Sequence, residues 1–160
     1  LFAVLGDPAL NVDESELPSE QATGRVPPNY ESLVPVASPS SEIELFLGRL
    51  GGNICVVYGT ATAMDASCVE PRFARTRAVA VNIPIYGEPL LRVALIPDRF
   101  ASAAAARPDL GGYESNILIV SDDAPAGRHV LRDEAGAELA LVIPAPWVDP
   151  RTASTSPPDP

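Results

Sequence analysis

Apolar and polar residues alternate over short stretches in the middle of the chain, and this alternation is typical of β-strands with one buried face. Residues 42–50, EIELFLGRL, place apolar side chains at every second position. Residues 53–60, NICVVYGT, form a β-branched run that indicates a buried strand, and the glycine pair between the two runs is a turn signal. The pattern therefore predicts a β-hairpin over residues 42–60.

Three further strands and a second hairpin are predicted downstream, at 73–87, 90–98, 116–123 and 128–144. The one run of strong helix formers is RFASAAAARPD, residues 99–109, which Pro108 ends. Residues 60–67 are expected to be a loop, and Gly111-Gly112 a flexible joint. Short strands at regular spacing with one short helix predict a mainly β fold, either an antiparallel sandwich or a partly open barrel.

The two ends of the chain have a different character, because proline recurs in them too often for a helix or a central strand. Ser, Asp and Glu fill the gaps between the prolines of residues 6–41, and such a segment buries too little apolar surface to offset its ordering entropy. We therefore expect an extended acidic arm at 1–41, a β domain at 42–146 and an extended or disordered tail at 147–160.

Charge adds one restriction on the partners of the chain. The formal net charge is −10, all eleven basic residues are arginine, and the acidity is concentrated in the first 40 residues. A chain this acidic is repelled by nucleic acid and by anionic membrane surfaces, although acidity also simply favours solubility. No apolar run approaches the roughly 20 residues that span a bilayer. The opening LFAVL is either a strand or the end of an upstream signal or membrane segment.

The chain has two cysteines, Cys55 and Cys68, which allow a disulfide, a redox pair, a metal site or two reduced thiols. A zinc site needs about four ligands, and the single histidine, His129, lies in a different predicted strand. A redox pair of the thioredoxin type needs two intervening residues rather than the twelve found here. A disulfide explains the pair best, and two reduced thiols in a cytosolic domain remain the alternative. The disulfide would tether a strand to the loop that leaves it, and it predicts an oxidising, extracytoplasmic location, either secreted or in the cell envelope.

Five short motifs resemble a group of uncharacterised actinobacterial proteins that have one membrane helix and an extracytoplasmic β domain. The matching stretches are LFAVLGDPALNVDESELP (1–18), GGNICVV (51–57), ASCVE (66–70), ALIPDRF (94–100) and SNILIV (115–120). The resemblance implies an exported or membrane-tethered domain, and it brings no catalytic residues. This chain has Arg99 where the group has glycine, so the resemblance does not extend to a tight turn after Asp98.

Catalytic chemistry has little support in the sequence. His129 is the one histidine, and the carboxylates near it in sequence are Asp122, Asp123 and Asp133. No Gly-x-Ser-x-Gly elbow accompanies them, and no Gly-rich phosphate loop with its lysine is present. We therefore expect no catalytic residues, no metal ligands and no cofactor. An aromatic binding surface remains conceivable from four residues, which more simply pack under turns: Tyr58, Tyr86, Tyr113 and Trp147.

These observations favour a non-catalytic extracytoplasmic interaction or structural domain that binds a protein partner through its arms. Two alternatives stay open. One is a small exported hydrolase or an enzyme inhibitor, which a deep pocket holding His129 with a carboxylate would favour. The other is a virion or shell decoration protein, because such proteins also combine a small β domain with extended arms.

Overall fold

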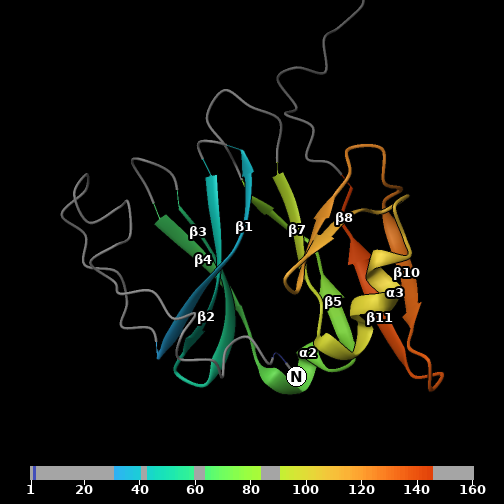
Figure 1. Ribbon diagram of the computed structural model, residues 1–160, viewed down its shortest axis with the longest axis horizontal. Coiled ribbons are helices and arrows are strands. Elements are labelled where there is room, and N and C mark those ends of the chain that lie inside the picture. The colour runs from blue at the N-terminus through green and yellow to red at the C-terminus, as the bar shows by residue number, and fades with distance from the viewer. Residues whose placement is uncertain (1, 3–30, 41–42, 60–63, 84–90, 146–160) are drawn as a thin grey trace, which may run out of the picture.

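A computed structural model describes residues 2, 31–40, 43–59, 64–83 and 91–145, and these fold into three β-sheets with short helices between them (Figure 1). The described residues are mainly β, and their sheets do not close into a barrel, which confirms the fold class expected from the pattern of short strands. The expected tail at 147–160 and most of the expected arm at 1–41 lie outside the described residues.

The first sheet holds four antiparallel strands in chain order: β1 (Ser32–Ser40), β2 (Ile43–Leu50), β3 (Asn53–Gly59) and β4 (Met64–Val69). The hairpin predicted over residues 42–60 is confirmed as β2 and β3. Its turn residues Gly51 and Gly52 both have positive φ, +56° and +78°. A type I′ turn requires positive φ at both of its central residues, and glycine adopts that conformation without strain.

Two expectations for this sheet were wrong. Residues 32–40 were expected to be irregular, yet they form strand β1, which begins well before the residue 42 at which β structure was expected. β1 is an edge strand whose register shifts after Pro35 and again after Ala37, and edges and bulges are where a sheet tolerates proline. The loop expected at 60–67 ends early, since β4 begins at Met64.

The second sheet has the order β6 (Val81–Ile83), β7 (Leu91–Leu95), β9 (Ile117–Val120) and β8 (Gly111–Glu114), again antiparallel. The strands predicted at 90–98 and 116–123 are confirmed. The flexible joint expected at Gly111-Gly112 was wrong, because both glycines belong to β8. β8 turns into β9 through Ser115 and Asn116, whose φ angles are +43° and +72°.

The third sheet has the order β10 (Gly127–Arg132), β11 (Glu138–Ile143) and β5 (Arg77–Val79). The hairpin predicted at 128–144 is confirmed as β10 and β11. β5 pairs with β11 in parallel, so the fold is not purely antiparallel as expected. The single strand expected at 73–87 is instead divided between two sheets, β5 here and β6 in the second, and the break falls at Ala80, whose N–H donates to the main-chain oxygen of Val142 at 2.9 Å.

The helix predicted at 99–109 is confirmed as a 3-10 turn, η4 (Asp98–Phe100), followed by α3 (Ala101–Ala105). A further one-turn helix, α2 (Pro71–Ala74), connects β4 to β5. None of the helices in the described ranges has the length and apolarity that crossing a bilayer requires.

The second sheet lies between the other two and is buried on both of its faces. Along β7 and β9, Val93 and Ile117 pack with apolar residues of the first sheet, whereas Ala94 and Leu118 pack with the third sheet and α3. Because successive side chains of a strand point to opposite faces, a strand buried on both sides is apolar throughout, which explains the run ILIV of β9. The described residues therefore form one core on each side of the second sheet, and a smaller buried cluster lies on the outer face of the first sheet.

Candidate functional site

Cys55 and Cys68 form a disulfide, as predicted, with an S–S distance of 2.06 Å and no free cysteine remaining. Cys68 lies in β4 rather than in a loop, and it is directly opposite Cys55 in the β3–β4 ladder. The bond therefore joins two neighbouring strands of the first sheet. Cys55 packs with Leu33, Phe46 and Val57, on the face opposite to the one that contacts the second sheet.

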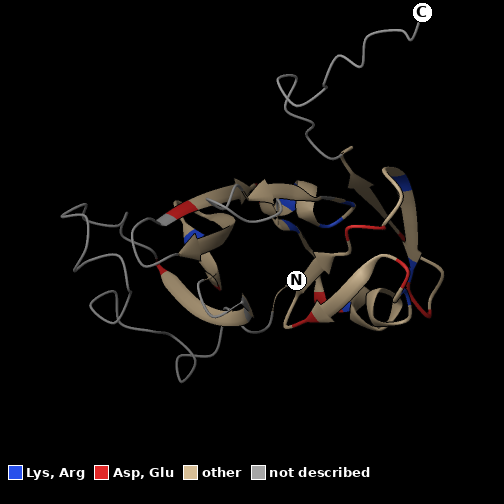
Figure 2. Cartoon of the chain, turned by 90° about the horizontal axis from the view of Figure 1, so that it is seen from above, with Lys and Arg blue, Asp and Glu red and all other residues tan. Residues whose placement is uncertain are grey.

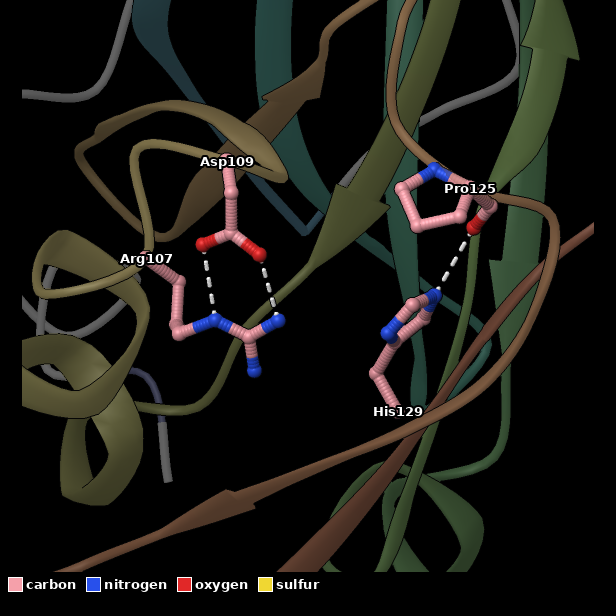
Figure 3. A network of polar contacts seen from close by, with 4 residues as sticks. All are labelled: Arg107, Asp109, Pro125 and His129. Carbon is pink, nitrogen blue, oxygen red and sulfur yellow. Dashed lines mark hydrogen bonds and ion pairs between the residues drawn. The ribbon is translucent and has the colours of Figure 1, made fainter.

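His129, the one candidate for acid–base chemistry, is held by the main chain in β10 (Figure 3). Its Nε2 lies 2.8 Å from the carbonyl oxygen of Pro125, and because a carbonyl only accepts hydrogen bonds, Nε2 carries the proton there. The carboxylate near it, Asp109, accepts two hydrogen bonds from Arg107, at 2.8 and 2.6 Å. The Arg107 hydrogen bonds, with a smaller contribution from His129, lower the pKa of Asp109. The carboxylate is therefore committed to an ion pair rather than to orienting the imidazole.

The three acidic residues considered near His129 in sequence bond to other groups, Asp122 and Asp123 through their main chain and Asp133 through its carboxylate. The main-chain oxygen of Asp122 accepts a hydrogen bond from Arg92, and the N–H of Asp123 donates to the hydroxyl of Ser121. Asp133 binds Arg99 and the N–H of Ala137 in the β10–β11 turn. In the described part of the chain no hydrogen bond joins any of them to His129, and no group of three or more His, Cys, Asp or Glu lies together as a metal site requires.

An apolar cavity of about 270 Å³ lies where the three sheets meet beside α2. Its buried lining comes from all three sheets and from α2: Val56, Ala74, Ala78 and Val93. Half-buried side chains of Val69, Val81 and Leu95 complete the apolar wall, together with Ser67 and Cys68. The exposed members are Phe73, with 51% of its surface accessible, Arg77 and Cys68, so the cavity opens to solvent beside α2, the start of β5 and the end of β4.

The opening of the cavity is locally positive. The segment Pro71–Arg77, PRFARTR, contains three arginines and no acidic residue. Arg72 pairs with Glu70 at 2.6 Å and lies over the ring of Phe73, 4.7 Å from its centroid. Among the described residues, Arg75 and Arg77 form no ion pair. Sequence reasoning missed this site, although three arginines within six residues of a chain with net charge −10 were a signal that could have found it.

A second, shallower hollow of about 480 Å³ lies against η4 and is lined by five residues: Arg75, Pro97, Asp98, Arg99 and Phe100. Arg75 lines this hollow, whereas the residue before it, Ala74, lines the apolar cavity. Arg99 is already paired with Asp133. Asp98 accepts a hydrogen bond from the side chain of Asn116, so two of the three charged residues of this hollow are engaged with neighbouring groups.

The outer edge of β4 is the other open feature. β4 ends the first sheet, and its residues have no main-chain hydrogen bond beyond those to β3 within the described residues. The N–H of Ala66 donates to the Asp65 carboxylate at 2.7 Å, so this N–H points away from β3. By the alternation of an antiparallel ladder, the N–H of Cys68 points outward as well. β4 therefore presents main-chain groups that no other described strand pairs with, beside the cavity that it helps to line.

The aromatic binding surface considered from the sequence is not assembled by the described residues. Of the four aromatic residues considered as a binding surface, Tyr58 lies in the first sheet and Tyr113 in the second, while Tyr86 and Trp147 lie outside the described residues. The buried Arg92, 3% exposed, was not foreseen. Its Nη2 donates to the main-chain oxygens of Ser121 and Asp122, and neither hollow described above borders it. Arg92 therefore has a structural role, because it links β7 to the turn that follows β9.

In comparisons with known proteins, no family model, no curated protein and no solved structure matches this chain.

Proposed function

We propose that this chain is a non-catalytic, extracytoplasmic interaction domain, exported or membrane-tethered, that binds a protein partner. The observation that carries the proposal is the open edge of β4, held in place by the Cys55–Cys68 disulfide. A sheet edge with unpaired main-chain groups is a template to which an extended segment of another protein adds as a further strand.

The disulfide supports the extracytoplasmic part of the proposal. Disulfides persist in secreted and envelope compartments, whereas in most cytosols cysteine thiols are kept reduced. This one joins the edge strand to its neighbour across a directly paired position. A covalent bond at that point keeps the edge extended and in register, which lowers the entropy lost when a partner strand adds to it.

The composition of β4 suits an edge strand that pairs with a partner strand. Its sequence, MDASCV, has one charge, Asp65, and it contains no proline of the kind that blunts unused edges. The Asp65 carboxylate accepts from one outward N–H, that of Ala66, whereas no described residue accepts from the outward N–H of Cys68. We further propose that the Pro-rich segments at the two ends of the chain add contacts to the same partner.

The geometry at His129 gives no support to the alternative of an exported hydrolase. The proton on Nε2 is bound to Pro125, Asp109 is engaged by Arg107, and neither hollow of the described structure is lined by either residue. A base that orients a nucleophile needs a free ring nitrogen, an orienting acid and a substrate cavity together. No observation favours the inhibitor or the virion and shell alternatives either.

Site-specific photo-crosslinking tests the proposal. A photoreactive residue at Asp65, on the edge of β4, should capture one defined protein in the envelope of the source organism, whereas the same residue at the exposed Arg128 of β10 should not. The captured protein is then purified, and its binding is measured with Ala66→Pro and Ala66→Val. Proline removes the outward N–H without breaking the β3–β4 ladder, and valine retains it.

We expect Ala66→Pro to weaken binding by about tenfold or more, because the proline ring obstructs the edge and removes the N–H that a partner strand would take over from Asp65. Ala66→Val should bind as the wild type does. Equal binding by the two variants would show that the partner does not use this edge. Capture of the same protein from Asp65 and from Arg128 would also overturn the proposal.

A further inference from the structure

The cavity beside α2 is open and apolar, and no described side chain fills it. Its volume of about 270 Å³ lies just below the 300–1,000 Å³ that is usual for small-molecule sites. An apolar cavity of this kind holds water poorly and favours an apolar ligand. Its size therefore suits one narrow apolar chain rather than a fused ring system.

The lining residues differ in exposure, and this difference determines how a ligand would be oriented in the cavity. Val56 and Val93, from the first and second sheets, are buried at the inner end, while Phe73 and Arg77 are exposed at the opening. A ligand that fits this gradient enters with its apolar end between the sheets. Its other end then remains beside Phe73 and Arg77, in contact with water.

The positive charge at the opening favours a ligand whose outer end is anionic. Arg77 lines the cavity and has no ion pair among the described residues, and Arg75 lies two residues before it. A guanidinium forms paired hydrogen bonds with carboxylate and phosphate groups. The negative charges elsewhere on the chain repel anions only weakly here, because they are screened beyond about 8 Å at physiological ionic strength.

We propose that this cavity binds a single-chain amphipathic anion, with its apolar tail between the first and second sheets and its carboxylate or phosphate head against Arg77. This site differs from the β4 edge in what it binds, and it does not depend on the proposed protein partner. Fatty acids and single-chain phospholipids share the required chemistry, and the head group distinguishes them.

Calorimetric titration of the full chain with dodecanoate and dodecanol, each below the concentration at which it aggregates, tests the proposal. The two probes have the same tail, so their difference isolates the head group. We expect dodecanoate to bind about three- to fivefold more tightly, as a partly exposed ion pair implies, and Arg77→Gln to abolish the difference. Arg128→Gln, an exposed arginine of β10, is the control and should leave the difference unchanged. Dodecyl phosphate in place of dodecanoate shows which head group is preferred.

A second variant tests where the tail lies. Val81→Phe places a ring in the cavity, so we expect both dodecanoate and dodecanol to lose binding while the thermal unfolding midpoint stays the same or rises. Val69→Phe fills the same cavity from the first sheet and should have the same effect. Equal affinity of the wild type for the two probes, undiminished binding to both phenylalanine variants, or no binding of either probe to the wild type would overturn the proposal.

Discussion

Gly111 in β8 lies against the main chain of Ile119 in β9, so closely that a Cβ atom at position 111 would be 1.9 Å from the Ile119 carbonyl oxygen. Its φ of +143° is also a conformation that residues with a side chain rarely adopt. We therefore predict that Gly111→Ala destabilises the fold by about 3 kcal/mol or more, since two separate costs add. Denaturant unfolding followed by circular dichroism measures the change.

The next residue supplies the control. A Cβ at Gly112 would meet nothing within 4 Å, and Gly112 is exposed in the same strand. Gly112→Ala should change stability by no more than about 0.5 kcal/mol. Similar effects of the two substitutions would mean that the close approach of β8 to β9 is not as described.

The Cys55–Cys68 disulfide should be a large contributor to stability. Cross-linking residues 13 positions apart removes loop-closure entropy from the unfolded chain, worth about 3 kcal/mol in the chain-entropy account. We predict that the double variant Cys55→Ala, Cys68→Ala folds with that much less stability, and that its unfolding midpoint no longer responds to reductant. A wild-type midpoint that is unaffected by complete reduction would contradict this prediction.

Much of the fold was predictable because its strands carry local patterns. The hairpins at 42–60 and 128–144 combine alternating or β-branched runs with glycine turns, and each signal lies within the segment that it predicts. The disulfide followed from the number and spacing of the cysteines. These features needed no knowledge of distant contacts.

The strands that were missed are defined by their neighbours rather than by their own residues. β1 contains Pro35, which only an edge position tolerates, and β8 begins with Gly111, which fits because Ile119 lies so close. The division of residues 73–87 at Ala80 follows from pairing with β11 on one side and β7 on the other. The cavity could not be foreseen for the same reason, because its lining comes from three sheets.

Tyr58 and Asp65 form a cross-strand pair next to the open edge, and their interaction predicts a response to alkaline pH. The Tyr58 hydroxyl donates to Asp65 at 3.1 Å. Burial first, and then the charge and hydrogen bond of Asp65, raise the pKa of Tyr58 from 10.0 to about 12. The folded chain thus keeps a proton that the unfolded chain has lost, so the stabilisation is complete below pH 10 and is lost as the pH rises towards 12.

Ultraviolet titration of tyrosinate absorbance tests this assignment, with Tyr58→Phe identifying the phenol concerned. We predict that Asp65→Asn lowers the pKa of Tyr58, because it removes the negative charge that disfavours tyrosinate, and that burial keeps the value above 10.0. An unchanged titration curve in Asp65→Asn would show that the carboxylate does not contact the hydroxyl.

Asp133 joins the β10–β11 turn to η4 and predicts a response at acid pH. One of its carboxylate oxygens accepts from Arg99 and the other from the N–H of Ala137 at 2.7 Å. The Arg99 hydrogen bond first, and then the Ala137 N–H, lower the pKa of Asp133. The contribution of Asp133 to stability is therefore complete above the unfolded value of about 3.9 and is lost as the pH falls through the lower folded value.

We predict that Asp133→Asn lowers the thermal unfolding midpoint at neutral pH, and that its curve and that of the wild type converge as the medium is made acidic. Glu134→Gln, at the exposed neighbouring position, should be nearly neutral throughout. The same asparagine substitution in an Arg99→Gln background should cost less, because the guanidinium that lowers the pKa of Asp133 is already gone. If the midpoints of wild type and Asp133→Asn instead differ by the same amount across the acid range, the residue acts through turn geometry. A contribution from the charged carboxylate would disappear as the carboxylate is protonated.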